Sequence, residues 1–239
     1  MDERVSTGSF DLNDFLEGGY ERDVITMLAG PPASGKTNLC VLAACSKVKD
    51  NGKVVFVDTE GGFSVERVKQ IVGEGYEEIL ENIFLLEPTS FKEQKECFKK
   101  LLDNVRKEHL DLIVIDGMAM LYRLELMDAV KSGEEDKIRE VNAEVARQMR
   151  ILSEISRKQK IPILITNQVY SKFSEKGSDK EKEVNLVGGN LFRYWSKCII
   201  ELKQEYHKRK LVLLKHRNLP IKEMDFEIKN KGIFKRRWI

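Results

Sequence analysis

One segment near the start of the chain has the residue types and the spacing needed to hold phosphate groups. The apolar run 24–29 is followed by the pattern G-x-x-x-x-G-K-[ST] and then by residues with helical spacing. Glycines let backbone N–H groups surround a phosphate, and the amino end of a helix adds a partial positive charge. In that geometry Lys36 reaches the β- and γ-phosphates of a nucleotide, and the Thr37 hydroxyl binds Mg²⁺. The residues predicted to bind ATP and Mg²⁺ are Gly30, Pro31, Pro32, Ala33, Ser34, Gly35, Lys36 and Thr37.

Carboxylate and amide side chains follow other apolar runs further along the chain. Asp116 ends one such run, and Glu60 and Gln168 each come shortly after another. Ligands of open α/β sheets bind at the carboxyl ends of strands, so we expect these side chains beside the phosphate-binding segment. Asp116 is then predicted to hold Mg²⁺ through water. Glu60 is predicted to orient the water that attacks the γ-phosphate, and Gln168 to sense that phosphate. On the residues alone, a surface capping role for Glu60 stays open.

The order of apolar segments predicts the scaffold that positions these groups. Short runs rich in β-branched residues alternate with segments of helical spacing, the clearest of which steps by three and four from Ile138 to Ile155. This alternation is typical of parallel βαβ units. The predicted strands of this part are 24–29, 54–58, 83–86, 112–116 and 161–166.

The pattern changes after Trp195. The apolar runs 198–202 and 211–215 are separated by a charged stretch too short for a crossover helix, so they predict an antiparallel extension at one sheet edge, to which 225–229 and 233–239 add. The predicted fold class is α/β, a mostly parallel twisted sheet flanked by helices with an antiparallel C-terminal extension. Residues 124–136 and 170–187 are predicted to be long loops.

Composition limits the class of protein. Apolar residues at 41% and charged residues at 33% exclude a disordered or collagen-like chain. We find no apolar run long enough for a membrane span and no signal peptide, and the four cysteines lack metal-ligand spacing, so a cytoplasmic protein is expected. Residues 203–239 carry 12 Lys and Arg against 4 Asp and Glu, although the net charge of the whole chain is only +2. A basic end on an acidic body is a candidate surface for a polyanion, or simply a solvated set of strands.

The ordered motifs resemble those of the RecA/RadA recombinase family. They are STG from Ser6, a Gly18-Gly19 pair, GPPASGKT, VDTEGGF from Val57, LIVIDGMAMLYR from Leu112, TNQV from Thr166, GGN from Gly188 and HRNLP from His216. The resemblance covers nearly the whole chain and is greatest to the short archaeal RadA paralogues, in which the core stands alone. It implies a RecA-like P-loop NTPase core over residues 1–239, as one domain without the N-terminal helical DNA-binding domain of the longer members.

The resemblance also implies roles for particular residues. Glu60 matches the carboxylate that orients water, and Gln168 matches the switch at the root of the second DNA-binding loop. Arg123 matches an arginine that stacks on adenine, although an ordinary surface arginine is the alternative. Lys215 and Arg217 match a segment that caps ATP from a neighbouring subunit, a role that requires assembly.

Two departures from the family pattern bear on DNA binding and on filament formation. The segment 124–136 matches the first DNA loop, but it holds five acidic residues against one lysine and is expected to repel phosphates. The linker that docks into the next subunit is also missing, so we do not expect a filament. The candidate DNA contacts are Lys208, Arg209, Lys210, Lys235, Arg236 and Arg237, with Tyr170 and Phe173 as candidates for base stacking.

The sequence therefore predicts an ATP-binding protein of DNA repair and homologous recombination with weak Mg²⁺-dependent ATPase activity and little strand exchange. Its expected partners are single-stranded or branched DNA and a RadA-type recombinase or a Holliday-junction resolvase. A DNA-stimulated, filament-forming recombinase is the main alternative. An ATP-dependent regulator or kinase that does not act on DNA is a further one.

Overall fold

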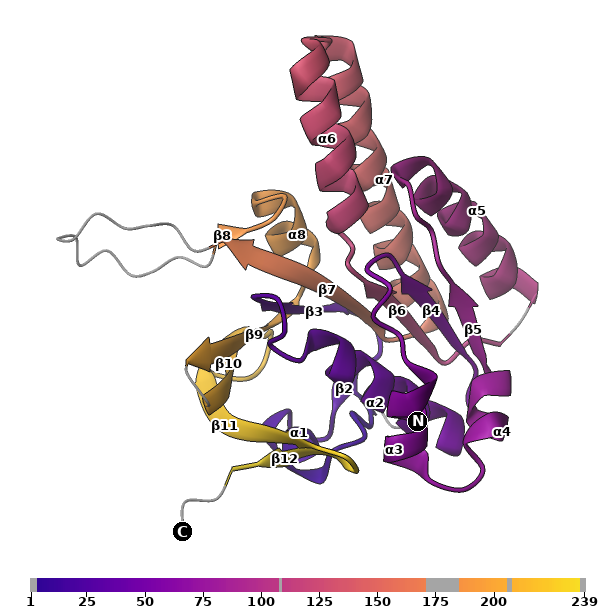
Figure 1. Cartoon of the computed structure of the whole chain (residues 1–239), viewed down its shortest axis with the longest axis vertical. Helices are drawn as coiled ribbons and strands as arrows, with labels where there is room; N and C mark the ends of the chain where they lie inside the picture. Colours follow the sequence, from indigo (N-terminus) through magenta and orange to yellow (C-terminus); the bar gives the residue numbers. More distant parts are fainter. Residues whose placement is uncertain (1–3, 108, 171–184, 206–207, 237–239) are drawn as a thin grey trace, which may run out of the picture.

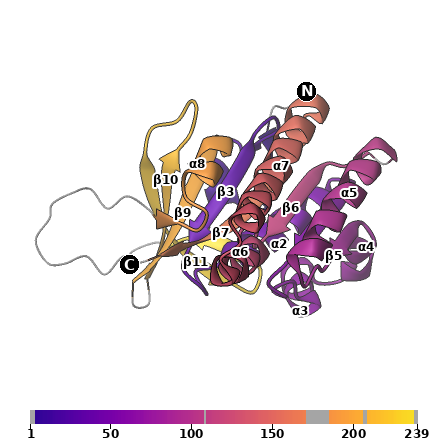
Figure 2. The same ribbon diagram turned by 90° about the horizontal axis from the view of Figure 1, so that it is seen from above.

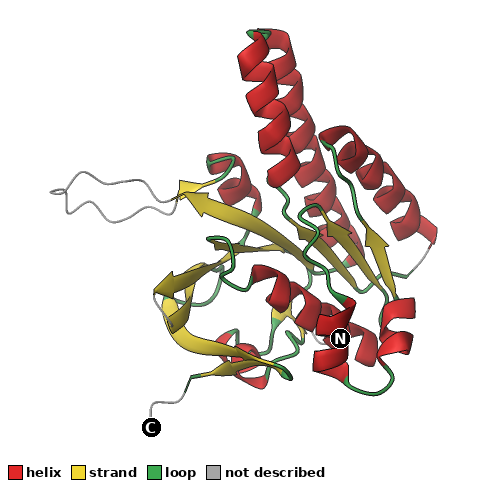
Figure 3. Ribbon diagram, viewed as in Figure 1, coloured by secondary structure: helices red, strands yellow, loops and turns green. Residues whose placement is uncertain are grey.

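The computed structural model describes residues 4–107, 109–170, 185–205 and 208–236 of the 239-residue chain. Helices and strands alternate as far as β7, and strands predominate after it (Figure 3). The helices are α1 (Phe10–Phe15), α2 (Lys36–Lys49), α3 (Val65–Val72), α4 (Tyr76–Glu81), α5 (Phe91–Lys107), α6 (Met120–Ser132), α7 (Glu135–Gln159) and α8 (Asn190–Trp195). The strands are β1 (Arg4–Val5), β2 (Tyr20–Glu21), β3 (Ile25–Gly30), β4 (Val54–Asp58), β5 (Ile83–Leu86), β6 (Leu112–Asp116), β7 (Ile163–Tyr170), β8 (Asn185–Leu186), β9 (Cys198–Glu205), β10 (Lys208–Lys215), β11 (Lys222–Lys229) and β12 (Gly232–Lys235).

A ten-stranded sheet organises the molecule. Its order is β12-β11-β10-β9-β3-β7-β6-β4-β5, with β8 paired to the end of β7. Every pairing from β9 through β3 to β5 is parallel, whereas β9, β10, β11 and β12 pair antiparallel. This confirms the predicted fold class, including the antiparallel extension. The carboxyl ends of β3, β7, β6 and β4 share one edge of the sheet as a result.

Successive residues of the central strands enter two different cores, as the period of a buried strand requires. Leu28 of β3 packs into the core beneath α1, α2, α3 and α4. Its neighbours Met27 and Ala29 pack into the core beneath α5, α6, α7 and α8. Figure 1 shows these two sets of helices on opposite faces of the sheet. Burial on both faces explains why these strands are continuous apolar runs.

Helix α7 carries the apolar face that its sequence spacing predicted. Val141, Val145, Met149, Leu152 and Ile155 are all buried. The helix is also polar on its other faces, with many exposed charges. No helix among the described residues is both long and apolar enough to cross a membrane.

The segment 124–136 is helical, so the prediction of a long loop there was wrong. It forms the end of α6, a turn at Gly133 in the left-handed region (φ 73°), and the first residues of α7. Glycine at the end of α6 meets no Cβ penalty in this conformation. Figure 1 shows α6 and α7 as an antiparallel pair that projects beyond the sheet. The acidic residues expected on a DNA loop are therefore fixed on a helical hairpin.

Candidate active site

The phosphate-binding segment leaves the sheet at the end of β3 and turns directly into α2. Ala33 (φ 60°) and Gly35 (φ 107°) both have positive φ, which bends the backbone sharply before the helix begins at Lys36. The Lys36 ammonium folds back over this loop and donates to the carbonyl oxygens of Gly30 and Pro31 at 3.0 and 2.9 Å. The loop and its lysine thus have the arrangement that surrounds a phosphate.

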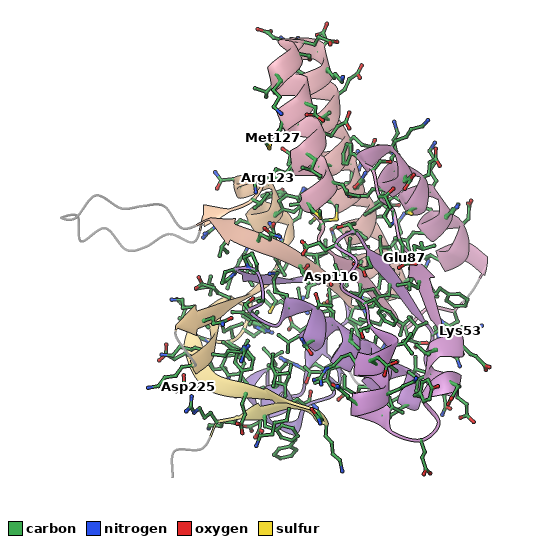
Figure 4. All side chains as sticks on the ribbon, in the orientation of Figure 1. Lys53, Glu87, Asp116, Arg123, Met127 and Asp225 are labelled. Carbon is green, nitrogen blue, oxygen red and sulfur yellow. The ribbon has the colours of Figure 1, made fainter. Side chains whose placement is uncertain are left out.

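Asp116 is buried at the end of β6, and both of its carboxylate oxygens accept short hydrogen bonds. Thr37 donates to Oδ2 and Thr166 to Oδ1, each at 2.6 Å. Burial raises the pKa of Asp116, while the two threonine hydroxyls oppose that rise and the carboxylates of Asp58 and Glu60 add to it. A cation placed here would offset the cost of the buried charge. Figure 4 shows Asp116 near the centre of the molecule.

Glu60 and Gln168 meet across the strand ends, where Gln168 Nε2 donates to Glu60 Oε1 at 3.2 Å. The backbone of Glu60 is held by the Asp58 carboxylate, which accepts from the Glu60 N–H at 3.1 Å. Gly117 (φ 88°) makes room for this approach, because a Cβ there would lie 2.7 Å from Glu60 Cγ and 2.3 Å from Thr59 Oγ1. The predicted water-orienting carboxylate and the predicted sensor are therefore in contact.

The electrostatic balance around Lys36 favours an anionic ligand. Burial lowers the pKa of Lys36, and the carboxylates of Glu60 and Asp116 partly oppose this. A phosphate in the loop would stabilise the charged ammonium, since an opposite charge favours the charged form. The buried hydroxyl of Ser34 has no hydrogen-bond partner among the described residues, which leaves a polar group of the loop available to a ligand.

The residues around Thr37 and Asp116 fit a magnesium ion that is bound partly by the protein and partly by a phosphate. A Cβ at Gly62 would lie 3.2 Å from Thr37 Oγ1 and 3.6 Å from Asp116 Oδ2, so the glycine leaves this position open. Across the described residues, no three His, Cys, Asp or Glu side chains form a metal-binding cluster. Mg²⁺ usually binds through one or two protein groups, several waters and substrate phosphates, and this site offers that donor set.

Arg123 lies on α6, where it lines a cavity of about 290 Å³ together with Glu60 and Gln168. Figure 4 shows Arg123 and Met127 along the same helix. Apolar side chains of α6 complete this wall and are exposed to between 37% and 58%; they are Met120, Leu124 and Met127, with Val130 beyond them. The cavity adjoins the predicted γ-phosphate position. Stacking of Arg123 on adenine stays a prediction.

The two cations predicted to act on a neighbouring subunit have partners within the chain. Lys215 Nζ donates to the carbonyls of Arg193 and Ser196 at the end of α8, at 2.7 and 2.8 Å. Arg217 forms an ion pair with Asp23 at 2.6 Å. These contacts hold both cations against their own subunit.

The basic clusters of the C-terminal strands are brought together by the sheet. Arg209 of β10 and Lys235 of β12 stand opposite Phe226 of β11 from its two sides, about 10 Å apart by strand spacing. Lys210 pairs with Glu223 at 2.8 Å, which reduces its free charge. Lys208 is exposed and Arg236 is half-buried at the end of β12. Tyr170 ends β7, whereas Phe173 and Arg237 lie outside the described residues.

The sequence reasoning missed the residues that hold the candidate catalytic groups in place. Thr166 donates to Asp116 and also accepts from the Gly117 N–H at 2.7 Å. Thr59 donates to the carbonyls of Asp116 and Gly117 at 3.0 and 2.9 Å. Thr59 had a visible signal, because it stands between the strand-end Asp58 and Glu60. Thr166 lies inside β7 and is followed by Asn167 and Gln168, so no neighbouring carboxylate marks it in the sequence. On α3, Arg67 donates to the carbonyls of Lys229 and Asn230, tying that helix to the C-terminal strands.

Comparison with known proteins places this site in a family. Residues 3–236 match the Rad51 family model. A relative described as "DNA repair and recombination protein RadB" from Methanobrevibacter smithii is 40% identical over 235 residues, covering 96% of this chain and 95% of the relative. Proteins of the same description from Methanococcus maripaludis and Methanocaldococcus jannaschii are 39% and 35% identical, over 93% of this chain and 96% and 98% of their own lengths. The chain belongs to the Rad51 family and, within it, to the archaeal RadB proteins.

Proposed function

We propose that this chain is an ATP-binding protein of DNA repair and homologous recombination that binds DNA and hydrolyses ATP slowly. The observation that carries the proposal is the meeting of Lys36, Thr37, Asp116, Glu60 and Gln168 at one edge of the sheet. These side chains come from four separate segments, and each has the chemistry that phosphoryl transfer from a nucleotide needs. The names of the RadB relatives supply the repair and recombination setting.

The proposed mechanism is positional and electrostatic. The loop amides and Lys36 would hold the β- and γ-phosphates of the nucleotide. Thr37 and Asp116 would hold a magnesium ion, which would supply positive charge to the phosphate oxygens. Glu60 accepts a hydrogen bond from the attacking water and aligns it in line with the γ-phosphate. Gln168 lies on β7 and donates a hydrogen bond to Glu60. Loss of the γ-phosphate would therefore change the position of Gln168 on the strand that precedes residues 171–184.

Slow turnover follows from the positions of Lys215 and Arg217. Cations donated by a neighbouring subunit raise phosphoryl-transfer rates by about 10³–10⁵. Here both cations bond within their own chain, and a subunit acting alone lacks that contribution. Little or no strand exchange is the corresponding expectation.

The proposed partners are single-stranded or branched DNA in the cytoplasm and a RadA-type recombinase or a Holliday-junction resolvase. Lys208, Arg209, Lys210, Lys235 and Arg236 supply a basic strand surface for the DNA backbone. The contact between Glu60 and Gln168 favours one alternative, a DNA-stimulated recombinase, because this contact would couple DNA binding to ATP hydrolysis.

The test compares DNA binding with and without ATP and Mg²⁺ for the wild type and for Lys36→Ala. We expect wild-type affinity for labelled single-stranded DNA to change when ATP is added, and Lys36→Ala to bind DNA at one affinity in both conditions. Lys49→Ala, at the other end of α2, is the control and should behave as wild type. Absence of DNA binding in every condition would refute the proposal, and so would unchanged ATP affinity in Lys36→Ala.

A further inference from the structure

A groove crosses the amino ends of the central strands, at the end of β3 opposite the phosphate loop. It consists of two adjoining cavities of about 660 and 350 Å³ that share Asp23, Ser153, Arg157 and Trp195. The last turns of α7, the end of α8 and the start of β3 form its walls, and these elements lie side by side in Figure 2. Because β3 spans six residues, the groove is about 17 Å from the phosphate loop. It is separate from the site described above.

Positive charge predominates along the groove. The lining cations are Arg150, Arg157, Lys158, Lys160, Lys197 and Arg217, and the lining anions are Asp23 and Glu154. Each anion is already paired, Asp23 with Arg217 and Glu154 with Lys158, both at 2.6 Å. For the other four cations, the described part of the chain offers no ion pair within 4.0 Å. The groove therefore presents four cations without a close ion pair, of which Lys160 interacts with Asp23 at longer range.

The helix dipole explains only part of this charge. Cations in the last turn of a helix are stabilised by its partial negative charge, which accounts for Arg157 and Lys158. Arg150 lies two turns earlier on the same face of α7, and Lys197 lies on the opposite wall after α8. The positive surroundings also reach Lys215, whose pKa is lowered first by burial and then by repulsion from Lys197 and Arg193.

An exposed tyrosine beside a half-buried tryptophan stands at the same groove. The Tyr194 side chain is 67% exposed. Its ring meets Trp195 edge to face at a centroid distance of 5.4 Å, and Lys197 Nζ lies 5.4 Å from the Tyr194 ring centroid. An exposed ring beside cations is the arrangement that binds bases of single-stranded nucleic acid by stacking while the cations hold the backbone.

We propose that this groove is a binding site for single-stranded DNA, with phosphates along the cations of α7 and a base stacked on Tyr194. The inference rests on the proposed DNA-binding function and assigns to it a surface that is distinct from the nucleotide site and from the basic clusters Lys208, Arg209, Lys210, Lys235 and Arg236. A phosphopeptide would use the charge alone, whereas the exposed ring adds a contact that a base satisfies. Duplex DNA keeps its bases stacked and would leave Tyr194 unused.

The experiment measures binding of labelled oligo-dT to the full chain by fluorescence anisotropy across a salt series. Arg157→Ala combined with Lys160→Ala is expected to weaken binding about tenfold and to reduce the salt slope by about 1.4, since each contact to a single strand contributes about 0.7. Lys137→Ala combined with Arg139→Ala, at the other end of α7, is the matched control and should leave both unchanged.

Tyr194 separates base recognition from charge. Tyr194→Ala is expected to weaken oligo-dT binding about fivefold or more, the range for one stacked base, while Tyr194→Phe retains the ring and stays near wild type. Inorganic polyphosphate, which has charge but no bases, should be insensitive to Tyr194→Ala. In a Trp238→Phe background Trp195 is the remaining tryptophan, and oligo-dT should quench its emission.

The outcomes distinguish this inference from the proposed function. Failure of the wild type to bind oligo-dT would refute DNA binding itself. Wild-type binding with an unchanged affinity and salt slope in the α7 double variant would refute the groove and leave DNA binding in place. Tighter binding of polyphosphate than of oligo-dT, with no effect of Tyr194→Ala on either ligand, would assign the groove to a phosphate-rich ligand other than DNA.

Discussion

The two ends of the central strands differ in how their charges are held. At the carboxyl end, Asp116 and Lys36 are buried and engaged by their own chain, since Asp116 accepts from two threonines and Lys36 donates to two carbonyls. Glu60 is exposed there, but it accepts a hydrogen bond from Gln168. At the amino end, Arg157 and Lys197 are exposed and have no ion pair within the described residues. One sheet thus carries a preorganised pocket at one end and an adaptable surface at the other.

The difference fits the two kinds of ligand that we propose. A nucleotide triphosphate is small and must be held in one geometry for its terminal bond to react, so fixed groups serve it. A nucleic-acid strand is long and uniform, so flexible cations serve it by displacing counterions. Substitutions at the carboxyl end should therefore change nucleotide binding and stability, whereas substitutions at the amino end should change DNA binding alone.

The largest expected effect is on nucleotide affinity in Lys36→Ala. Hydrogen bonds to charged groups contribute about 1.5–3 kcal/mol each, so ATP affinity should fall by at least about a hundredfold when the contacts to two phosphates are lost. Stability should change little, because burial already lowers the pKa of this lysine and disfavours its charge. Isothermal titration calorimetry with Mg²⁺–ATP measures the affinity. A tenfold or smaller loss would contradict the assigned role.

Thr166→Val should destabilise the fold most among the conservative changes. It removes the hydroxyl that donates to Asp116 and accepts from the Gly117 N–H. Leaving buried polar groups unsatisfied costs about 1–3 kcal/mol per group, so we expect a loss of about 2–4 kcal/mol. Thr166→Ser keeps the hydroxyl and is the control. Denaturant unfolding measures both, and equal stability of the two variants would show that the hydrogen bonds are unimportant.

Asp116→Asn should raise the stability of the nucleotide-free protein near neutral pH. The folded-state pKa of Asp116 is raised by burial, so its ionised form costs stability above that pKa. The free energy of unfolding of the wild type should therefore increase as the pH falls from above the raised pKa toward the ordinary pKa of an aspartate. The variant should therefore be more stable than the wild type at neutral pH, and this advantage should shrink as the pH falls over that window. Thermal unfolding across pH measures it; a variant less stable at neutral pH would contradict the account.

The smallest expected effect is on the stability of groove variants. Arg157→Ala combined with Lys160→Ala removes exposed side chains without ion pairs among the described residues, so the free energy of unfolding should stay within about 0.5 kcal/mol of wild type. ATP affinity should also be unchanged. A loss of stability as large as that of Thr166→Val would show that the two ends of the sheet are not held differently.

Much of the site at the carboxyl ends of the strands could be predicted because its functional residues belong to short, contiguous motifs. The strand ends at Asp58 and Asp116 were predicted to the residue, and Glu60 and Gln168 were expected beside the same phosphate-binding segment, where they lie in contact at 3.2 Å. The supporting threonines were missed because a hydroxyl residue within a strand or just after one has many ordinary explanations. Their role depends on which strands are neighbours in the sheet, and only the folded structure shows that.

The hairpin and the groove could not be predicted for different physical reasons. Helix α6 turns Leu124, Met127 and Val130 to its exposed side, so its apolar residues lack the one-sided spacing of a core-packed helix. The groove gathers cations from the end of α7, from Lys197 after α8 and from Arg217 between β10 and β11, which are far apart in the sequence. A local pattern does not contain such a surface, because only the folded chain brings these segments together.

The most direct test of the central claim is ATP turnover over a series of protein concentrations, with and without single-stranded DNA, using Lys36→Ala as the blank. The account predicts slow turnover that depends on neither variable, because Lys215 and Arg217 bond within their own subunit. Turnover that rises steeply with both protein and DNA would show that subunits assemble and complete each other's sites. That result would contradict the account and support a filament-forming recombinase.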